Sequence, residues 1–305
     1  MNQRRLFVLT GPTAVGKTEW ALRWAEENRA EIVSCDSLLF YRGMDIGTAK
    51  PTAEEQSRVP HHLIDLCEVT ERIDVTQFVA EAKKVVEQIH ARGRHVLVAG
   101  GSGFYLKAFF GPIADEVAVA PALRQEIDAA LKRDGLPALV EQLRALNPAG
   151  LGTLDVANPR RVVRALERCR ASGKTLCELA EEFAKIPGPF SNWAVQLVRL
   201  ERSPDAINRR IEARVDAMLK LGLIDEVRRL DAAGLRSNPS ASKAIGYRET
   251  LEYLTGALPE TELRSAIITN TRALVKKQRT WFRTQLPPHK ELAAADGYQR
   301  DLFAL

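Results

Sequence analysis

A glycine-rich segment near the N-terminus has the spacing of a phosphate-binding loop. GPTAVGKT, residues 11–18, fits the pattern G-x-x-x-x-G-K-[ST] and stands between an apolar run and a segment of helical periodicity. Backbone N–H groups of such a loop, and of the helix N-terminus after it, form a cradle for anions. Lys17 would add a positive charge, and the Thr18 hydroxyl would bind Mg²⁺. The segment predicts a site for a di- or triphosphate, made of Gly11, Pro12, Thr13, Ala14, Val15, Gly16, Lys17 and Thr18.

Asp36 is the acidic residue best placed to act beside this loop. It follows the apolar run 32–35, and ligands of open α/β sheets bind at the carboxyl ends of the strands. Asp36 could be a base or a ligand of a metal-bound water, or it could only cap a helix or a turn. No apolar run ends in the aspartate of a typical Walker B motif. The run 95–99 leads instead into Gly100-Gly101-Ser102-Gly103, which suits a backbone turn and a ligand contact equally well.

Two other pairs of residues could bind an anion or a metal. Arg210 and Arg214 lie one helical turn apart and could clamp an anion between them. His61 and His62 are adjacent, so their side chains diverge and cannot both hold one metal ion. We expect the two histidines to pack or to form hydrogen bonds.

Basic side chains gather on two predicted helices. Four arginines fall within an arc of about 100° if their segment is helical: Arg160, Arg161, Arg164 and Arg168. Residues 264–290 hold seven basic residues and no acidic one, and four of them form a stripe at helical spacing: Arg272, Lys276, Arg279 and Arg283. Such faces are usually only solvated. Two of them, with Trp281 and Phe282 beside the second, favour binding to a phosphate backbone.

Strand-like and helix-like segments alternate in the first hundred residues. Short apolar runs at 6–9, 32–35 and 95–99 predict strands buried on both faces. The helices predicted between them, at 19–28 and 76–92, imply a parallel sheet.

The middle of the chain differs from its start. Residues 113–192 show helical periodicity only, 193–200 predict another strand, and the chain from residue 204 onwards is mostly helical. We therefore predict an α/β protein with a P-loop parallel-sheet core, residues 1–112 and 193–305, and an inserted all-helical domain, residues 113–192.

Composition excludes several classes of protein. The chain has 305 residues and a net charge of only +5, which is too small for a histone-like protein. Its four cysteines contain no C-x-x-C pair, which argues against a zinc ribbon and a disulfide framework. The N-terminal apolar run is too short for a signal peptide, and no apolar stretch reaches the length of a membrane span. We expect a cytoplasmic protein without membrane association.

Several motifs together make the chain resemble the tRNA dimethylallyltransferase (tRNA isopentenyltransferase) family, in particular its short, bacterial-type members. DSLLFYRGMDIGTAKP at 36–51 and TRALVKKQRTWFR at 271–283 are the most specific of them. The others are GPTAVGKT at 11–18, HHLIDL at 61–66, GGSGFYLKA at 100–108, RRVVRALE at 160–167, RRIEARVDAMLKLGLIDEV at 209–227 and KAIGYRE at 243–249.

This resemblance implies an activity and a set of catalytic residues. The enzyme would move a dimethylallyl group from dimethylallyl diphosphate to the exocyclic N6 amine of the adenosine 3′-adjacent to the anticodon, releasing diphosphate. The P-loop would hold the diphosphate of the donor instead of hydrolysing ATP. Asp36 would be the general base, and Thr13 and Arg214 would act with Lys17 on the diphosphate. Mg²⁺ is the expected cofactor, and Thr18 its expected protein ligand.

The resemblance also implies residues that bind the anticodon stem-loop of tRNA. Asp36, Ser37, Leu38 and Leu39 would line the flipped adenosine, with Ser102 and Arg124 nearby. The anticodon arm would contact Arg160, Arg161, Val162, Val163 and Arg164, and also Lys243, Ala244, Ile245, Gly246, Tyr247 and Arg248.

The chain departs from the family pattern at three of these sites. Leu39 replaces a frequent glutamine and cannot hydrogen-bond a base edge, so it would pack against the prenyl group or the base. Ser102 replaces a threonine, and Val15 a small polar residue of the P-loop. We expect the protein to act as a monomer.

Two other functions remain open from the residues themselves. A P-loop small-molecule kinase would use Asp36 to activate a hydroxyl group toward ATP, and would need basic residues only near the phosphates. A nucleotide-gated RNA-binding module would have no use for Asp36, Lys17 and Arg214 together.

Overall fold

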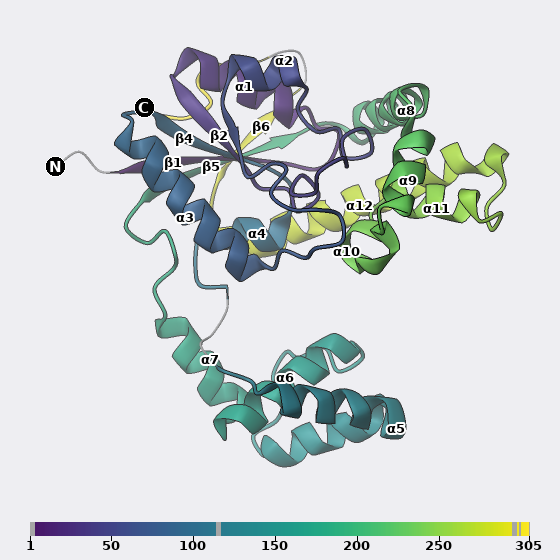
Figure 1. Cartoon of the computed structure of the whole chain (residues 1–305). Helices are drawn as coiled ribbons and strands as arrows, with labels where there is room; N and C mark the ends of the chain where they lie inside the picture. The colour runs from purple at the N-terminus through teal and green to yellow at the C-terminus, as the bar shows by residue number, and fades with distance from the viewer. Residues whose placement is uncertain (1–3, 114–116, 295–297, 299, 305) are drawn as a thin grey trace. The chain divides into compact units, whose positions relative to one another are not determined.

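The computed structural model describes residues 4–113, 117–294, 298 and 300–304. The chain forms two compact units: Met1–Gly111 with Gly188–Leu305, and Pro112–Pro187. We call the first the sheet unit and the second the helical unit (Figure 1).

Within the described residues, the sheet unit is built on six parallel strands in the order β3-β2-β4-β1-β5-β6. The strands are β1 (Arg5–Thr10), β2 (Ala30–Ser34), β3 (His61–His62), β4 (His95–Ala99), β5 (Ala194–Glu201) and β6 (Lys290–Ala293). This confirms the α/β class and the strands predicted from the four apolar runs. The chain after residue 204 is mostly helical, as predicted, but it also contains β6, which the sequence did not single out and which pairs with β5.

Side chains of β1 alternate between two apolar layers, as a strand covered on both faces requires. Leu6 and Val8 belong to one core cluster, and Phe7 and Leu9 to the other. The helices of this unit are α1 (Lys17–Glu27), α2 (Ala53–Arg58), α3 (Val75–Ala91), α4 (Gly103–Lys107), α8 (Pro204–Lys220), α9 (Leu223–Ala232), α10 (Pro239–Ser242), α11 (Tyr247–Leu254) and α12 (Glu260–Gln285), with a 3-10 turn at Leu235–Ser237. Helix α1 covers one face of the sheet, and α3 and α4 cover the other (Figure 1).

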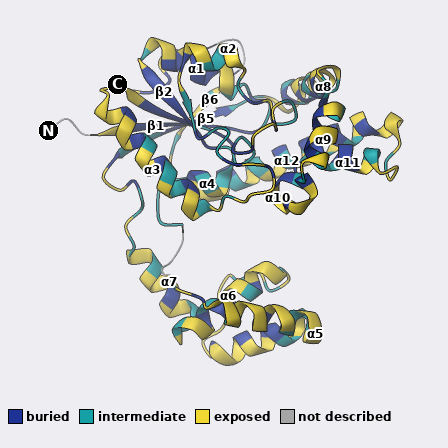
Figure 2. Cartoon of the chain, viewed as in Figure 1, coloured by how far each residue is buried: buried dark blue, intermediate teal, exposed yellow. Residues whose placement is uncertain are grey.

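The helical unit has a core of its own. It contains α5 (Pro121–Leu146), α6 (Pro159–Ser172) and α7 (Leu176–Lys185). Helix α5 is interrupted at Gly135, whose φ of 78° lies outside the helical region. The apolar stripes of the three helices meet in a cluster that includes Ile127, Leu166 and Leu179. Figure 2 shows these helices as largely exposed, with patches of buried residues.

The helical unit ends at Pro187, not at the predicted residue 192. Phe190 stacks on Phe109 of the sheet unit, with ring centroids 4.6 Å apart, and Trp193 belongs to the same core cluster as Leu6. Residues 188–193 therefore belong to the sheet unit because their aromatic side chains bury against it.

Candidate active site

The P-loop joins β1 to α1 in a conformation that needs its glycines. Gly11 has a φ of 149°, and a methyl group there would lie 2.6 Å from the Leu200 carbonyl oxygen. Gly16 has a φ of 107°, in the left-handed region that favours glycine. Helix α1 starts at Lys17, so its free N–H groups face the loop.

Lys17 is held inside this loop. Its Nζ donates to the carbonyl oxygens of Gly11 and Pro12 at 2.9 and 3.0 Å. Burial lowers the pKa of Lys17 to about 8, although the Asp36 charge opposes this shift. The ammonium group is therefore a cation that loses its proton far more easily than an exposed lysine does.

Arginines just after β5 and on α8 support the loop from outside. Arg202 Nε donates to the Val15 carbonyl and Arg210 Nε to the Ala14 carbonyl, both at 2.7 Å. Arg214, one turn further along α8, donates to the Thr48 carbonyl at 3.0 Å. Burial lowers the pKa of Arg214, and the Asp36 carboxylate opposes the shift. Arg210 therefore orders the P-loop, while Arg214 lies beside Asp36. All three side chains line the same cavity.

Two cavities meet at the carboxyl edge of the sheet. The first, the P-loop cavity, has a volume of about 560 Å³ and is lined by Lys17, Thr18 and Arg210 and by apolar residues such as Ile64. The second, the α12 cavity, has a volume of about 690 Å³. Its wall contains Ser37, Leu38, Ser102, Phe104, Lys243, Ile245, Arg248, Lys277, Gln278 and Trp281. Thr13, Asp36, Thr48 and Arg214 line both cavities.

Asp36 lies where the carboxyl end of β2 was expected to place it. Its Oδ1 accepts a hydrogen bond of 3.1 Å from the Leu38 N–H, so the carboxylate also caps a turn, as the alternative interpretation had it. The two interpretations do not exclude each other, because Asp36 also lines both cavities. Of the two cavities, Leu39 lines the P-loop cavity, whereas Ser37 and Leu38 line the α12 cavity.

The Gly100–Gly103 segment makes a close backbone approach, and part of it also lines a cavity. A methyl group on Gly100 would lie 2.1 Å from the Cys35 carbonyl oxygen, so this position is a close backbone approach. Ser102 Oγ accepts from the Ser37 N–H at 3.2 Å and lines the α12 cavity.

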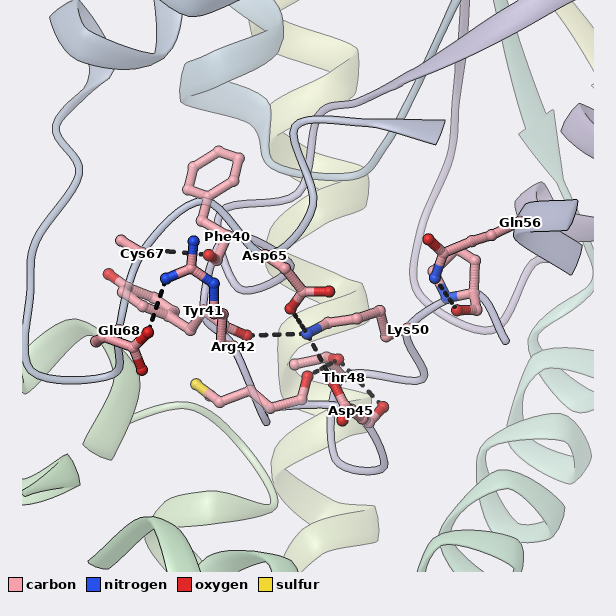
Figure 3. Close-up of polar contacts among 12 residues, drawn as sticks. Phe40, Tyr41, Arg42, Asp45, Thr48, Lys50, Gln56, Asp65, Cys67 and Glu68 are labelled. Carbon is pink, nitrogen blue, oxygen red and sulfur yellow. Dashed lines mark hydrogen bonds and ion pairs between the residues drawn. The ribbon is translucent and has the colours of Figure 1, made fainter. Parts of the chain in front are cut away.

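A buried lysine anchors the loop that follows Asp36 (Figure 3). The side chain of Lys50 is only 4% exposed. Its Nζ lies 2.9 Å from the Tyr41 carbonyl oxygen, 2.7 Å from the Asp45 carboxylate and 2.5 Å from the Asp65 carboxylate. These contacts tie the loop 45–50 to the segment after β3. Residue-by-residue reasoning missed Lys50, although it belongs to the motif at 36–51.

Gln278 of α12 is a second residue that the sequence analysis did not single out. Its Oε1 accepts from the Thr13 N–H at 2.9 Å, and its Nε2 donates to the Gly101 carbonyl at 3.2 Å. One amide thus joins the P-loop to the Gly100–Gly103 segment. The only sequence signal for it is its place in the motif at 271–283.

Three of the expected RNA-contacting side chains are buried. Val162 is 0% exposed in the core of the helical unit. Tyr247 is also 0% exposed, and its hydroxyl donates to Glu226 at 2.6 Å. Their side chains cannot contact RNA directly, which corrects that part of the expectation for both segments. Ala244 is also buried, and Gly246 has a φ of 92°, whereas Lys243, Ile245 and Arg248 line the α12 cavity.

Four arginines of the helical unit that were expected to bind RNA are exposed, whereas Arg168 of the predicted arginine face is half-buried. Arg160 and Arg161 are exposed at the start of α6, where the Asn158 side chain caps the helix, and Val163 is half-buried. Arg164 is exposed and lies 3.1 Å from Glu167. Arg124 is exposed on α5.

The basic stripe of α12 is not continuous. Arg272 pairs with Glu212 of α8 at 2.5 Å, and Arg279 with Glu201 of β5 at 3.3 Å. The two glutamates belong to other elements of the fold, so the sequence of residues 264–290 alone gives no sign that the stripe is interrupted. Lys277 is exposed and lines the α12 cavity, and Lys276 and Arg283 are exposed as well.

The adjacent histidines hydrogen-bond as expected. His61 Nδ1 lies 2.8 Å from the Val59 carbonyl, and His62 Nε2 lies 2.7 Å from Glu31. Among the described residues, no cluster of three or more His, Cys, Asp and Glu side chains could hold a metal ion. Within the same residues, no helix combines the length and apolarity that a membrane span requires.

Comparisons with known proteins find relatives over most of the chain. Residues 39–285 match the model of the IPP transferase family. The chain is 64% identical to the tRNA dimethylallyltransferase of Opitutus terrae over 96% of this chain and 94% of that protein, and 39% identical to that of Bordetella pertussis over 93% and 91%.

Solved structures show the same fold. A tRNA isopentenylpyrophosphate transferase from Bacillus halodurans aligns with a TM-score of 0.69 at 34% identity, over 95% of this chain and 90% of that one. A eukaryotic dimethylallyltransferase acting on tRNA aligns with a TM-score of 0.83 at 26% identity, over 96% and 74%. The match of the family model and the identity to these relatives over nearly the whole chain show that the protein belongs to the IPP transferase family.

Proposed function

We propose that this protein transfers the dimethylallyl group of dimethylallyl diphosphate to the N6 amine of the adenosine 3′-adjacent to the anticodon of tRNA, and releases diphosphate. The observation that supports this most is the meeting of two cavities at Thr13, Asp36 and Arg214. One cavity has the cations and backbone N–H groups that a diphosphate needs. The other is lined by aromatic and basic side chains, which suit an extruded base and its phosphates.

In this proposal the donor lies in the P-loop cavity. The N–H groups of residues 11–18, with Lys17 and Arg214, bind the diphosphate and stabilise the negative charge that grows on it as the C–O bond breaks. Apolar residues of the same cavity, including Leu39 and Ile64, suit the five-carbon group. Leu39 would therefore contact the prenyl group and not the base edge.

The acceptor adenosine lies in the α12 cavity. Its amine nitrogen attacks the allylic carbon, and Asp36 takes the proton that the nitrogen loses as the new C–N bond forms. The electron pair of the breaking C–O bond leaves with the diphosphate. Ser37, Leu38 and Ser102 line this cavity beside Asp36 and would surround the base.

The tRNA would also contact basic residues of both units. Lys243, Arg248 and Lys277 line the α12 cavity and suit phosphates next to the extruded base. Arg124, Arg160, Arg161 and Arg164 of the helical unit suit phosphates of the anticodon arm. Since each cavity is complete within one chain, we propose that a monomer acts, and that it acts in the cytoplasm, where its tRNA substrate would be found.

The residues fit a Mg²⁺ ion bound together with the donor. Thr18 is an exposed hydroxyl on the first turn of α1 and lines the P-loop cavity. Mg²⁺ commonly takes few protein ligands and completes its shell with phosphate oxygens and water. When bound, Mg²⁺ would neutralise charge on the departing diphosphate. Thr18 would hold the ion, and Lys17 and Arg214 would orient the diphosphate.

The proposal is tested by incubating the purified protein with unmodified tRNA and dimethylallyl diphosphate. Mass analysis of the digested nucleosides should show an adenosine heavier by one dimethylallyl group. A second incubation with ATP and small hydroxyl compounds tests the kinase alternative. Phosphoryl transfer from ATP, together with unmodified tRNA in the first incubation, would refute the proposal.

A further inference from the structure

Glu226 is a buried carboxylate of α9 that lies beneath the loop 45–48. Its residue is only 1% exposed. Glu226 is not among the described residues that line the P-loop cavity or the α12 cavity. A charged side chain buried to this extent is stable only when its oxygens are fully hydrogen-bonded.

Four donors from two segments satisfy this carboxylate. Oε2 accepts from the N–H groups of Asp45 at 3.0 Å and Ile46 at 2.7 Å. Oε1 accepts from the Gly47 N–H at 3.1 Å and from the Tyr247 hydroxyl at 2.6 Å. Hydrogen bonds to a carboxylate are stronger than those between neutral groups. Three consecutive amides of the loop are thus fixed by one side chain.

The loop that Glu226 holds carries the acceptor for Arg214. Thr48 follows the three bound amides directly, and its carbonyl accepts from Arg214 at 3.0 Å. Gly47 and Thr48 also lie in the wall of the α12 cavity. There is no room for the loop to shift toward Tyr247, because a methyl group on Gly47 would lie 2.5 Å from the tyrosine ring.

The other end of the network lies in the segment 243–248. Tyr247 is buried, whereas Lys243 and Arg248 on either side of it line the α12 cavity. The loop on the donor side and the segment on the acceptor side therefore share one carboxylate.

We infer that Glu226 is a positioning residue for the transfer reaction: by fixing the loop 45–48 it sets the place of Arg214 at the diphosphate. The inference rests on the proposed function, since Arg214 is taken to bind the diphosphate of the donor. A misplacement of the order of 1 Å at such a group costs up to about 100-fold in rate.

Glu226→Gln is the most informative variant. The side chain keeps its size, but one oxygen becomes an NH₂ group that would point at an N–H donor of the loop. We expect the dissociation constant of inorganic pyrophosphate, measured by calorimetry, to rise about tenfold or more, and kcat/KM for dimethylallyl diphosphate to fall by about 10- to 100-fold. The dissociation constant of tRNA should change far less. Glu31→Gln is the matched control, because Glu31 is a buried carboxylate that pairs with Arg92 and His62, away from the loop.

A double-mutant cycle separates positioning from general destabilisation. If Glu226 acts through Arg214, the Arg214→Ala, Glu226→Gln double variant should bind pyrophosphate no more weakly than Arg214→Ala alone. Additive losses, or an equal loss in Glu31→Gln, would overturn the inference. Should Glu226→Gln fail to fold, Glu226→Asp serves instead, since it keeps the charge but is too short to reach all four donors.

The pyrophosphate measurement also keeps the two proposals apart. A wild-type protein that modifies no tRNA would refute the proposed function. Unchanged pyrophosphate binding in Glu226→Gln would refute the role of Glu226, whatever the wild type does with tRNA.

Discussion

The backbone N–H of Thr13 donates a hydrogen bond of 2.9 Å to the side-chain Oε1 of Gln278, across a sequence separation of 265 residues. Thr13 belongs to the P-loop and lines both cavities, and Gln278 belongs to α12. Helix α12, near the C-terminus, therefore holds part of the P-loop, near the N-terminus.

Replacing Gln278 should separate binding of the donor from stability. Gln278→Ala removes the acceptor for Thr13 and the donor to Gly101, so both segments gain freedom at the reacting centre. We expect kcat/KM for dimethylallyl diphosphate to fall about tenfold or more, with a small change in melting temperature because the residue is half-buried. Gln278→Glu can still accept from Thr13, but its second oxygen would face the Gly101 carbonyl and add negative charge beside the diphosphate, so it should lose activity as well. Equal activity of all three proteins would contradict the role given to this amide.

Asp36→Asn should remove the base while keeping the cavity shape. Without a proton acceptor, turnover should drop by about 100-fold or more. The dissociation constant of tRNA, measured by filter retention, should stay near the wild-type value, because basic side chains and not Asp36 bind the tRNA phosphates in this proposal. A variant with wild-type turnover would exclude Asp36 as the base.

The lowered pKa of Lys17 predicts a pH dependence. In the proposed mechanism the charged ammonium binds the diphosphate, and the charged fraction of Lys17 in the free enzyme falls as the pH rises through about 8. Values of kcat/KM for the donor, which report the free enzyme, should therefore decline above about pH 8. Lys17→Arg keeps its charge throughout and should lack this decline, whatever its absolute rate. A wild-type profile that stays flat to pH 10 would argue against a charged Lys17 as the binding group.

Neutralising Arg160, Arg161 and Arg164 should weaken tRNA binding in a salt-dependent way. Each lost phosphate contact reduces the slope of log K against log salt by about 0.7 to 0.9, so the triple Gln variant should show a slope smaller by about 2 to 3. The control replaces Arg133 and Arg144, exposed arginines of α5 that pair with Asp134 and Glu141. An unchanged slope in the triple variant would mean that this face is only solvated.

Lys50→Met should destabilise the sheet unit. It removes a buried ammonium that contacts two carboxylates and the Tyr41 carbonyl (Figure 3). Asp45 and Asp65 are partly exposed and can be hydrated, so we expect a loss of about 2 kcal/mol in the free energy of unfolding. Arg42→Gln, which breaks an exposed pair with Glu68, should cost less than about 1 kcal/mol. Denaturant unfolding curves of the two variants test the difference.

Local pattern was enough for the parts of the site that lie within one short segment. The P-loop, the strands β1, β2, β4 and β5, and the position of Asp36 at a strand end all follow from residue type and spacing over fewer than ten neighbours. Strand β6 did not follow, because Lys290–Ala293 is a short, half-charged edge strand with no apolar alternation.

Amino-acid order alone thus determined which segment has the pattern of a phosphate-binding loop, which carboxylate stands beside it and which helices carry positive charge. Tertiary structure decided which of those charges remain available, because Glu201 and Glu212 pair with part of the α12 stripe. It also decided which side chains of the predicted RNA-binding segments are exposed, since Tyr247 and Val162 are buried. It also decided that Gln278, Lys50 and Glu226 hold the site together. The physical reason is that a hydrogen bond or ion pair depends on distance in space, and residues 180 or 265 positions apart become neighbours only when the sheet and its helices have packed.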